Sequence, residues 1–161
     1  MTLSHLDAAG RARMVNVGGK PDSVRRAVAE GTIVMSSAAA ELVRLESGPK
    51  GEVLATAELA GTMGAKRTAD LIPLCHPVGL DHVEVEATLD EALPGVRIRA
   101  AVQATGRTGV EMEALTAVSV ALLTVYDMVK AAGHGMRIGE IVLLEKSGGT
   151  SGDWKRSRHD R

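Results

Sequence analysis

Residues 109–131 read GVEMEALTAVSVALLTVYDMVKA, and this stretch decides the fold. Apolar residues occur on nearly every side of the predicted helix, which is typical of a helix that is covered by neighbours on several sides. A run of about 20 apolar residues is also long enough to span a membrane. Four charged residues stand near the two ends of the run: Glu111, Glu113, Asp127 and Lys130. They argue against a membrane span, so we predict a core helix with charged groups at both ends.

Segments with strand character flank this helix on both sides. The patterns predict strands at residues 14–17, 32–35, 83–87, 96–102 and 138–144. Residues 23–31 are compatible with either a helix or a strand. The turn signals at residues 18–22 and 90–95 separate neighbouring elements.

Two further helical runs are predicted between the second and third strands. The first begins after a cap at Ser36 or Ser37 and extends to about Glu46. The second covers residues 50–71 and ends before Pro73, because the residue before a proline avoids the helical region. Its predicted interruptions are Gly61 and Gly64.

The order of strand, two helices, strand hairpin, helix and strand predicts the fold class. It is an α+β sandwich of ferredoxin-like type, with a mostly antiparallel sheet and helices packed on one face. A length of 161 residues fits a single domain over residues 1–161. Residues 1–13 and 147–161 are polar or glycine-rich, and we expect both ends to be flexible.

The composition excludes several classes of partner. A formal net charge of −1 gives no bulk attraction to nucleic acid or membranes, and an aromatic content of 1% leaves few rings for base stacking. A single cysteine excludes an intrachain disulfide and favours a cytoplasmic setting, and the N-terminus has no apolar core of signal-peptide length. We also expect oligomerisation, because a small aliphatic core gains from burying more surface.

The acids at the start of the core helix allow two interpretations. Thr108 followed by Glu111 matches a capping box, which favours a purely structural role for Glu111. Glu113 is not needed for that box. It either stabilises the positive end of the helix dipole or takes part in binding.

Asp127 near the other end opposes the helix dipole, and Lys130 three residues later relieves this. The pair is either a simple intrahelical ion pair or a proton-transfer or phosphate-binding pair. Glu113 and Asp127 are 14 residues apart, which is about 21 Å along a helix. One small substrate cannot reach both within one copy, so a site using both is either long or shared between subunits.

Residues 73–77 read PLCHP and hold Cys75 next to His76. Zinc needs about four ligands in a spaced set, and the sequence offers no second cysteine and no spaced histidine pair, so no metal is expected. Neighbours in an extended segment point in opposite directions, which argues against a Cys–His catalytic pair. Cys75 is then a packed residue, and His76 is either an exposed loop residue or an acid, base or phosphate ligand.

Positive charge is scattered rather than grouped in a run. The candidates for binding a polyphosphate are Lys50, Lys66, Arg67, Lys130 and Lys146. Residues 61–68 lack the adjacent Gly-Lys-Thr of a Walker loop, and residues 147–152 are better interpreted as a tail than as a phosphate loop.

Three segments together carry a resemblance to a known family. They read AKRTADLIPLCHP at 65–77, TGVEMEALTA at 108–117 and YDMVKA at 126–131. With SHLD at 4–7 and EKSGG at 145–149, the chain closely resembles the MoaC family of molybdenum cofactor biosynthesis. The resemblance covers nearly the whole chain.

The resemblance implies cyclic pyranopterin monophosphate synthase activity. In that reaction a 3′,8-cyclised dihydro-GTP is rearranged into a pyranopterin with a cyclic phosphate, and pyrophosphate leaves. It also implies a homohexamer, a trimer of dimers with active sites between subunits. We expect no cofactor.

Site residues are carried over position by position. The resemblance implies catalytic roles for Asp127, Lys50, Lys130 and His76. It implies substrate-binding roles for Leu74, Cys75, His76, Met112, Glu113, Glu111, Arg25, Lys66 and Lys146. The chain departs from the family's pattern at Asn16, Ala69 and Thr150; Asn16 lies at the entry turn, and Thr150 stands where a basic tail residue is common. The alternative is a non-catalytic nucleotide- or pterin-binding paralogue or assembly subunit, which binds without releasing pyrophosphate.

Overall fold

The computed structural model describes residues 6–7, 9–45, 52–150 and 152–157. Its elements in chain order are β1 (Ser23–Val34), α1 (Ser37–Arg44), α2 (Val53–Lys66), α3 (Thr68–Leu71), β2 (His82–Asp90), β3 (Gly95–Gly106), α4 (Glu111–Val129), the 3-10 turn η1 (Lys130–Ala132), β4 (Arg137–Ser147) and β5 (Trp154–Lys155).

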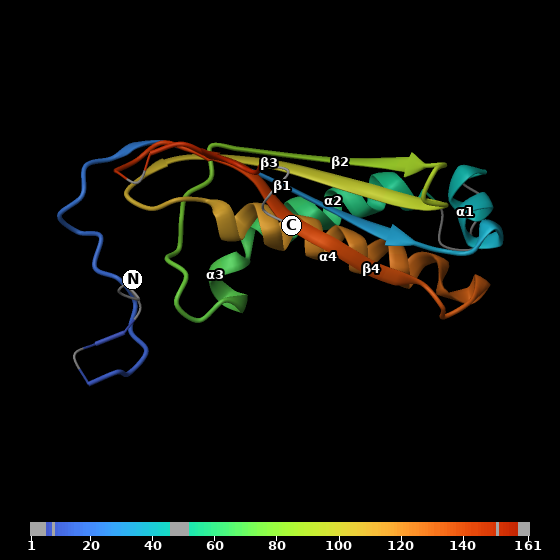
Figure 1. Ribbon diagram of the computed structural model, residues 1–161, viewed down its shortest axis with the longest axis horizontal. Helices are drawn as coiled ribbons and strands as arrows, with labels where there is room; N and C mark the ends of the chain where they lie inside the picture. Colours follow the sequence, from blue (N-terminus) through green and yellow to red (C-terminus); the bar gives the residue numbers. More distant parts are fainter. Residues whose placement is uncertain (1–5, 8, 46–51, 151, 158–161) are drawn as a thin grey trace.

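The strands form one sheet in the order β2-β3-β1-β4-β5, and every pairing is antiparallel. The helices α2 and α4 run along one face of this sheet (Figure 1). The predicted α+β sandwich of ferredoxin-like type is confirmed, and the ambiguous stretch at 23–31 is a strand. Alternation along β1 explains the layering, since Ala27, Ala29 and Ile33 point into the core between sheet and helices.

The core helix α4 lies against β1, β3 and α2. Residues 111–132 are long and apolar enough to cross a membrane by length and composition alone, but 56% of the most apolar window is buried inside the fold. Gly31 on β1 lets the helix approach the sheet, because a Cβ there would lie 2.8 Å from a methyl of Val118. Burial on several sides accounts for the continuous apolar pattern.

The predicted interruptions of α2 are wrong, since the helix runs without a break through Gly61 and Gly64. Both glycines face α4. A Cβ on Gly64 would lie 2.8 Å from the Val120 side chain, and one on Gly61 would lie 3.0 Å from the Ala117 carbonyl oxygen. The glycines therefore allow two helices to pack closely, and the actual break comes at Arg67, between α2 and α3.

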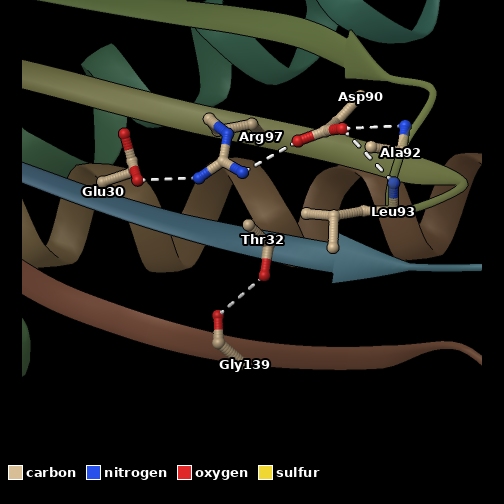
Figure 2. A network of polar contacts seen from close by, with 7 residues as sticks. All are labelled: Glu30, Thr32, Asp90, Ala92, Leu93, Arg97 and Gly139. Carbon is tan, nitrogen blue, oxygen red and sulfur yellow. Dashed lines mark hydrogen bonds and ion pairs between the residues drawn. The ribbon is translucent and has the colours of Figure 1, made fainter. Parts of the chain in front are cut away.

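The other face of the sheet carries polar side chains. Arg97 on β3 binds Glu30 on β1 and Asp90 at the end of β2, each at 2.8 Å (Figure 2). This network lies near the β2–β3 turn, so it ties the hairpin to the central strand at the end of the sheet opposite the start of α4 (Figure 1).

Several predicted boundaries shift. Ser36 caps α1 as expected, accepting a hydrogen bond from the Ala39 amide, but the helix ends at Arg44. Residues 14–17 form no strand. The expected flexible tail contains β5, which pairs with the end of β4. Residues 46–51 lie outside the described part of the chain.

Candidate functional site

A polar cavity of about 410 Å³ lies beside the start of α4. The ends of β1 and β4 and the loops before β1 and α4 converge there. Its walls are Val15, Val17, Lys20, Arg25, Arg26, His76, Arg107, Thr108, Gly109, Glu111, Lys146, Ser147, Gly148 and Thr150. Five of these carry fixed positive charge and one carries negative charge, so the cavity is suited to an anion.

Arg25 is the most buried cation of this cavity, with only 9% of the residue exposed. Its Nε donates to the carbonyl oxygen of Gly106 at 3.2 Å. Within the described residues no carboxylate pairs with it. A buried charge without a counterion is costly, so this position indicates a place where an anionic ligand supplies the missing charge.

The other cations of the cavity are partly neutralised. Arg26 pairs with Glu145, and Arg107 pairs with Asp22 at 3.3 Å. Lys20 lines the cavity with no ion pair to a described residue. Positive charge in excess of the pairs therefore comes mainly from Lys20 and Arg25.

The capping box predicted for Glu111 is wrong. The N-cap of α4 is Val110, and no side chain in the described part of the chain caps the helix start. Glu111 instead lies 3.3 Å from the Nζ of Lys146, which comes from the far end of β4. This pair joins the helix start to the last long strand across the wall of the cavity.

Glu113 is almost completely buried, with 2% of the residue exposed. One carboxylate oxygen lies 3.5 Å from the Sγ of Cys75, and the other has no hydrogen-bond partner among the described residues. Burial raises the pKa of Glu113 above its usual value. Burial, reinforced by the Glu113 charge, raises the pKa of Cys75 to about 11, so Cys75 is a neutral thiol at physiological pH.

A second, more apolar cavity of about 300 Å³ adjoins the first. Its walls are Ile72, Leu74, Cys75, His76, Thr108, Gly109, Glu111 and Met112, and both cavities share His76, Thr108, Gly109 and Glu111. The Nε2 of His76 is 2.8 Å from the Val15 carbonyl oxygen, which makes His76 an anchored wall residue rather than an exposed loop residue. Cys75 and His76 contact different partners, as the extended segment predicted.

Asp127 and Lys130 lie at the opposite end of α4. The Lys130 Nζ is 2.6 Å from the Asp127 Oδ1, which confirms the predicted ion pair, and the side chains are 54% and 49% exposed for Asp127 and Lys130. The hydrogen bond to Asp127 raises the pKa of Lys130. The two regions lie near opposite ends of the 19-residue helix α4, so one chain does not bring this pair to the two cavities.

Two of the predicted site residues stand apart. Lys66 is exposed at the end of α2 and lines neither cavity. Lys50 lies outside the described residues. Among the described residues, no group of three or more His, Cys, Asp or Glu side chains is placed to hold a metal ion.

Sequence reasoning missed several cavity residues. Lys20 and Arg107 lie in turns, whereas Arg26 lies within β1, and the three form no run, so no local pattern singles them out. The only signal was position, since Lys20 and Arg107 stand in the turns that lead into β1 and α4. Thr150, noted as a departure in the tail, also lies in the cavity wall.

Comparison with known proteins gives a consistent result. The profile of the MoaC family matches residues 14–149. The chain is similar to the cyclic pyranopterin monophosphate synthase of Methylobacterium sp. (strain 4-46), with 62% identity over 153 residues, which is 95% of this chain and 96% of that protein. The residues that the family profile matches include the Asp127–Lys130 pair, the second cavity, and the first cavity except Thr150.

Proposed function

Since the chain belongs to the MoaC family, we propose that it converts a 3′,8-cyclised dihydro-GTP into cyclic pyranopterin monophosphate and pyrophosphate. It is a lyase of molybdenum cofactor biosynthesis. The observation that carries this conclusion is the identity with a cyclic pyranopterin monophosphate synthase over nearly the full length of both chains. We also propose that residues 1–161 form a single domain.

The chemistry of the two cavities suits such a substrate. Lys20 and Arg25 offer positive charge to a triphosphate and to departing pyrophosphate. Glu113 has a buried oxygen without a hydrogen-bond donor, and the N–H groups along one edge of a guanine-derived ring are donors of the required kind. We propose that the phosphates occupy the cationic cavity and the ring lies toward Cys75, Met112 and Glu113.

Opening and closing rings requires proton transfer. Asp127 and Lys130 form a pair suited to it, because a carboxylate and an ammonium within hydrogen-bond distance can exchange roles as acid and base. We propose Asp127, Lys130 and Lys50 as catalytic groups, with His76 adding a fourth from the cavity wall. Leu74, Glu111, Lys66 and Lys146 complete the proposed substrate-binding set.

The separation of these groups supports a shared site. About 21 Å of helix lies between Glu113 and Asp127, which are 14 residues apart in the sequence. We propose a homohexamer, a trimer of dimers, in which the two ends of α4 serve different active sites that neighbouring subunits complete. We further propose that the enzyme works in the cytoplasm.

The direct test is incubation of the purified protein with the cyclised GTP substrate. We expect release of pyrophosphate together with a cyclic phosphate product. Substrate binding without pyrophosphate release would support the non-catalytic paralogue instead. Native mass in solution checks the assembly, and a clean monomer with full activity would contradict the shared site.

A mixing experiment tests the shared site more sharply. Asp127→Asn and Arg25→Met change groups at opposite ends of α4, and both variants have low activity when the substrate concentration is far below KM. If each site combines the ends of two chains, co-assembly of the two variants restores about a quarter of the wild-type activity under these conditions, because random pairing leaves that share of sites intact. If one chain supplies both ends, the mixture has only the average activity of the two variants. Two samples of a single variant, treated in the same way, are the control.

A further inference from the structure

We propose that Gly149 is a positioning residue for Arg25, because the guanidinium of Arg25 lies in the space that a side chain at position 149 would fill. This inference rests on the proposed function, since it says which residue fixes the position of the Arg25 guanidinium in the cavity proposed for the phosphates. A Cβ built on Gly149 would lie 1.4 Å from Nη1 and 2.5 Å from Cζ of Arg25. No side chain fits there while Arg25 keeps its place.

The guanidinium is otherwise held by a single hydrogen bond. Nε donates to the Gly106 carbonyl at 3.2 Å, and within the described residues the structure records no other hydrogen bond or ion pair from Arg25. The Nη groups are therefore available to a ligand. Gly106 fixes one edge of the guanidinium, and the backbone at Gly149 limits where the rest of it can go.

The loop that carries Gly149 is anchored on both sides. The amide of Gly148 donates to Asp153 at 3.0 Å, and the amide of Gly152 donates to the Gly149 carbonyl at 3.3 Å. Beyond the loop, Trp154 and Lys155 pair with the end of β4. A Cβ on Gly148 would lie 2.0 Å from the Val24 carbonyl oxygen, so the loop already packs against the backbone of β1.

These anchors decide which group moves when Gly149 gains a methyl group. The loop is tied to β1, β4 and Asp153, whereas the guanidinium is the far end of a flexible side chain with one hydrogen bond. The guanidinium is the group that yields, and an anion in the cavity then loses its best-placed charged donor. The effect falls on ligand affinity rather than on the fold.

Gly152 provides a matched control in the same loop. Gly149 and Gly152 have φ of +81° and +70°, so alanine pays a similar backbone cost at either position. A Cβ on Gly152 meets nothing within 4 Å. The two alanine variants therefore differ mainly in whether the added methyl group reaches Arg25.

The experiment measures the dissociation constant of inorganic pyrophosphate by calorimetry on the full chain. The variants are Gly149→Ala, Gly152→Ala, Arg25→Met and the double variant Arg25→Met with Gly149→Ala. We expect Gly149→Ala to weaken binding by about tenfold or more, as loss of one charged hydrogen bond does, while Gly152→Ala binds as the wild type. In the Arg25→Met background, Gly149→Ala should cause no further loss. In turnover, Gly149→Ala should raise KM and leave kcat nearly unchanged.

Several outcomes overturn the proposal. The first is wild-type affinity for pyrophosphate in Gly149→Ala. The second is an equal loss of affinity on Gly149→Ala in the wild-type and Arg25→Met backgrounds. The third is no pyrophosphate binding by the wild type. Unfolding of Gly149→Ala while Gly152→Ala stays folded also overturns it, because the fold itself, rather than the position of Arg25, would then require glycine at position 149. The proposed function fails separately: a wild-type protein that shows this binding pattern but does not turn over the cyclised GTP refutes the activity and leaves the role of Gly149 intact.

Discussion

The two ends of α4 are built in opposite ways. At its start, Glu113 and Arg25 are almost fully buried beside two adjoining cavities. Among the described residues, the second carboxylate oxygen of Glu113 has no hydrogen-bond donor, and the guanidinium of Arg25 has no counterion. At its end, Asp127 and Lys130 pair with each other while about half of each side chain remains exposed.

The difference shows which end is prepared for a ligand within a single chain. Burying a carboxylate oxygen and a guanidinium without partners costs free energy, and a bound ligand with matching donors and charge recovers it. The exposed pair of Asp127 and Lys130 carries little such cost, because ion pairs on the surface contribute about 0–1 kcal/mol. The first end is therefore suited to binding, whereas Asp127 and Lys130 at the second end line neither of the two cavities.

The largest expected effect comes from the exposed end. Asp127→Asn should lower kcat by about a thousandfold, since it removes a group proposed for proton transfer. The melting temperature should stay close to that of the wild type, because the lost pair is exposed. Pyrophosphate release and thermal unfolding measure the two effects.

Glu41→Gln on α1 is the matched control for this prediction. Glu41 and Arg44 form another i,i+3 ion pair at 3.2 Å, with side chains that are 55% and 50% exposed, and neither lines the two cavities. We expect unchanged kcat in this variant. Full activity in Asp127→Asn would remove the exposed end from the mechanism and would leave the start of α4 as the whole site.

The reactivity of Cys75 tests the enclosure at the start of α4. With a pKa raised to about 11, the thiol at pH 8 holds on the order of a hundredth of the thiolate of an ordinary cysteine. Alkylation by iodoacetamide, followed by mass spectrometry, should be slower than that of a free thiol by at least this factor. Guanidinium-unfolded protein supplies the reference rate, and equal rates in the two states would mean that this end is as open as the other.

The fold followed from the sequence because its signals are local. Alternation marked the strands β2 and β3, Ser36 marked the start of α1, and the apolar run marked α4. Two errors came from patterns that serve tertiary packing. Gly61 and Gly64 were predicted to interrupt α2, but they allow it to pack closely against α4. Residues 14–17 were predicted as a strand, but they form none, and Val15 and Val17 line the cationic cavity.

The site was less accessible because its contacts join distant parts of the chain. Thr108 and Glu111 have the spacing of a capping box, yet Glu111 pairs with Lys146, which is 35 residues further along the chain. No local rule weighs a partner at that distance. The proposed binding roles of Cys75, Met112 and Glu113 came from the family resemblance, and the geometry adds the burial of Glu113 and its unpartnered oxygen.

Arg25→Lys sharpens the contrast between a binding end and a catalytic end. Lysine keeps the charge but lacks the planar fork of arginine and has no Nε–H for the Gly106 carbonyl. We expect KM to rise by about tenfold with kcat nearly unchanged, as for loss of a contact made in both ground and transition states. Steady-state kinetics on the cyclised GTP substrate give both constants. A fall in kcat with unchanged KM would place Arg25 with Asp127 in the chemical step.

The smallest expected effect concerns the free energy of folding that is lost by burying the carboxylate of Glu113. Because burial raises its pKa, the folded protein holds a proton on Glu113 at pH values where the unfolded chain has released it. Stability therefore falls as pH rises from the unfolded pKa, about 4.3, through the higher folded pKa. Glu113→Gln removes this slope and retains an oxygen for the Cys75 thiol. At pH 7 it should be more stable than the wild type by about 1 kcal/mol, and the difference should vanish near pH 4.

Chemical denaturation at a series of pH values measures this difference. Glu84 is an exposed glutamate on β2, and Glu84→Gln is the control with no expected change.

The same Glu113→Gln variant should bind substrate less well, because an amide offers one acceptor where the carboxylate offered two. A gain in stability combined with a loss of affinity would mean that the enclosed end of α4 sacrifices stability for binding. If Glu113→Gln is instead less stable at pH 7, the buried carboxylate already has a favourable partner in the folded protein, and the contrast between the two ends of the helix loses its energetic basis.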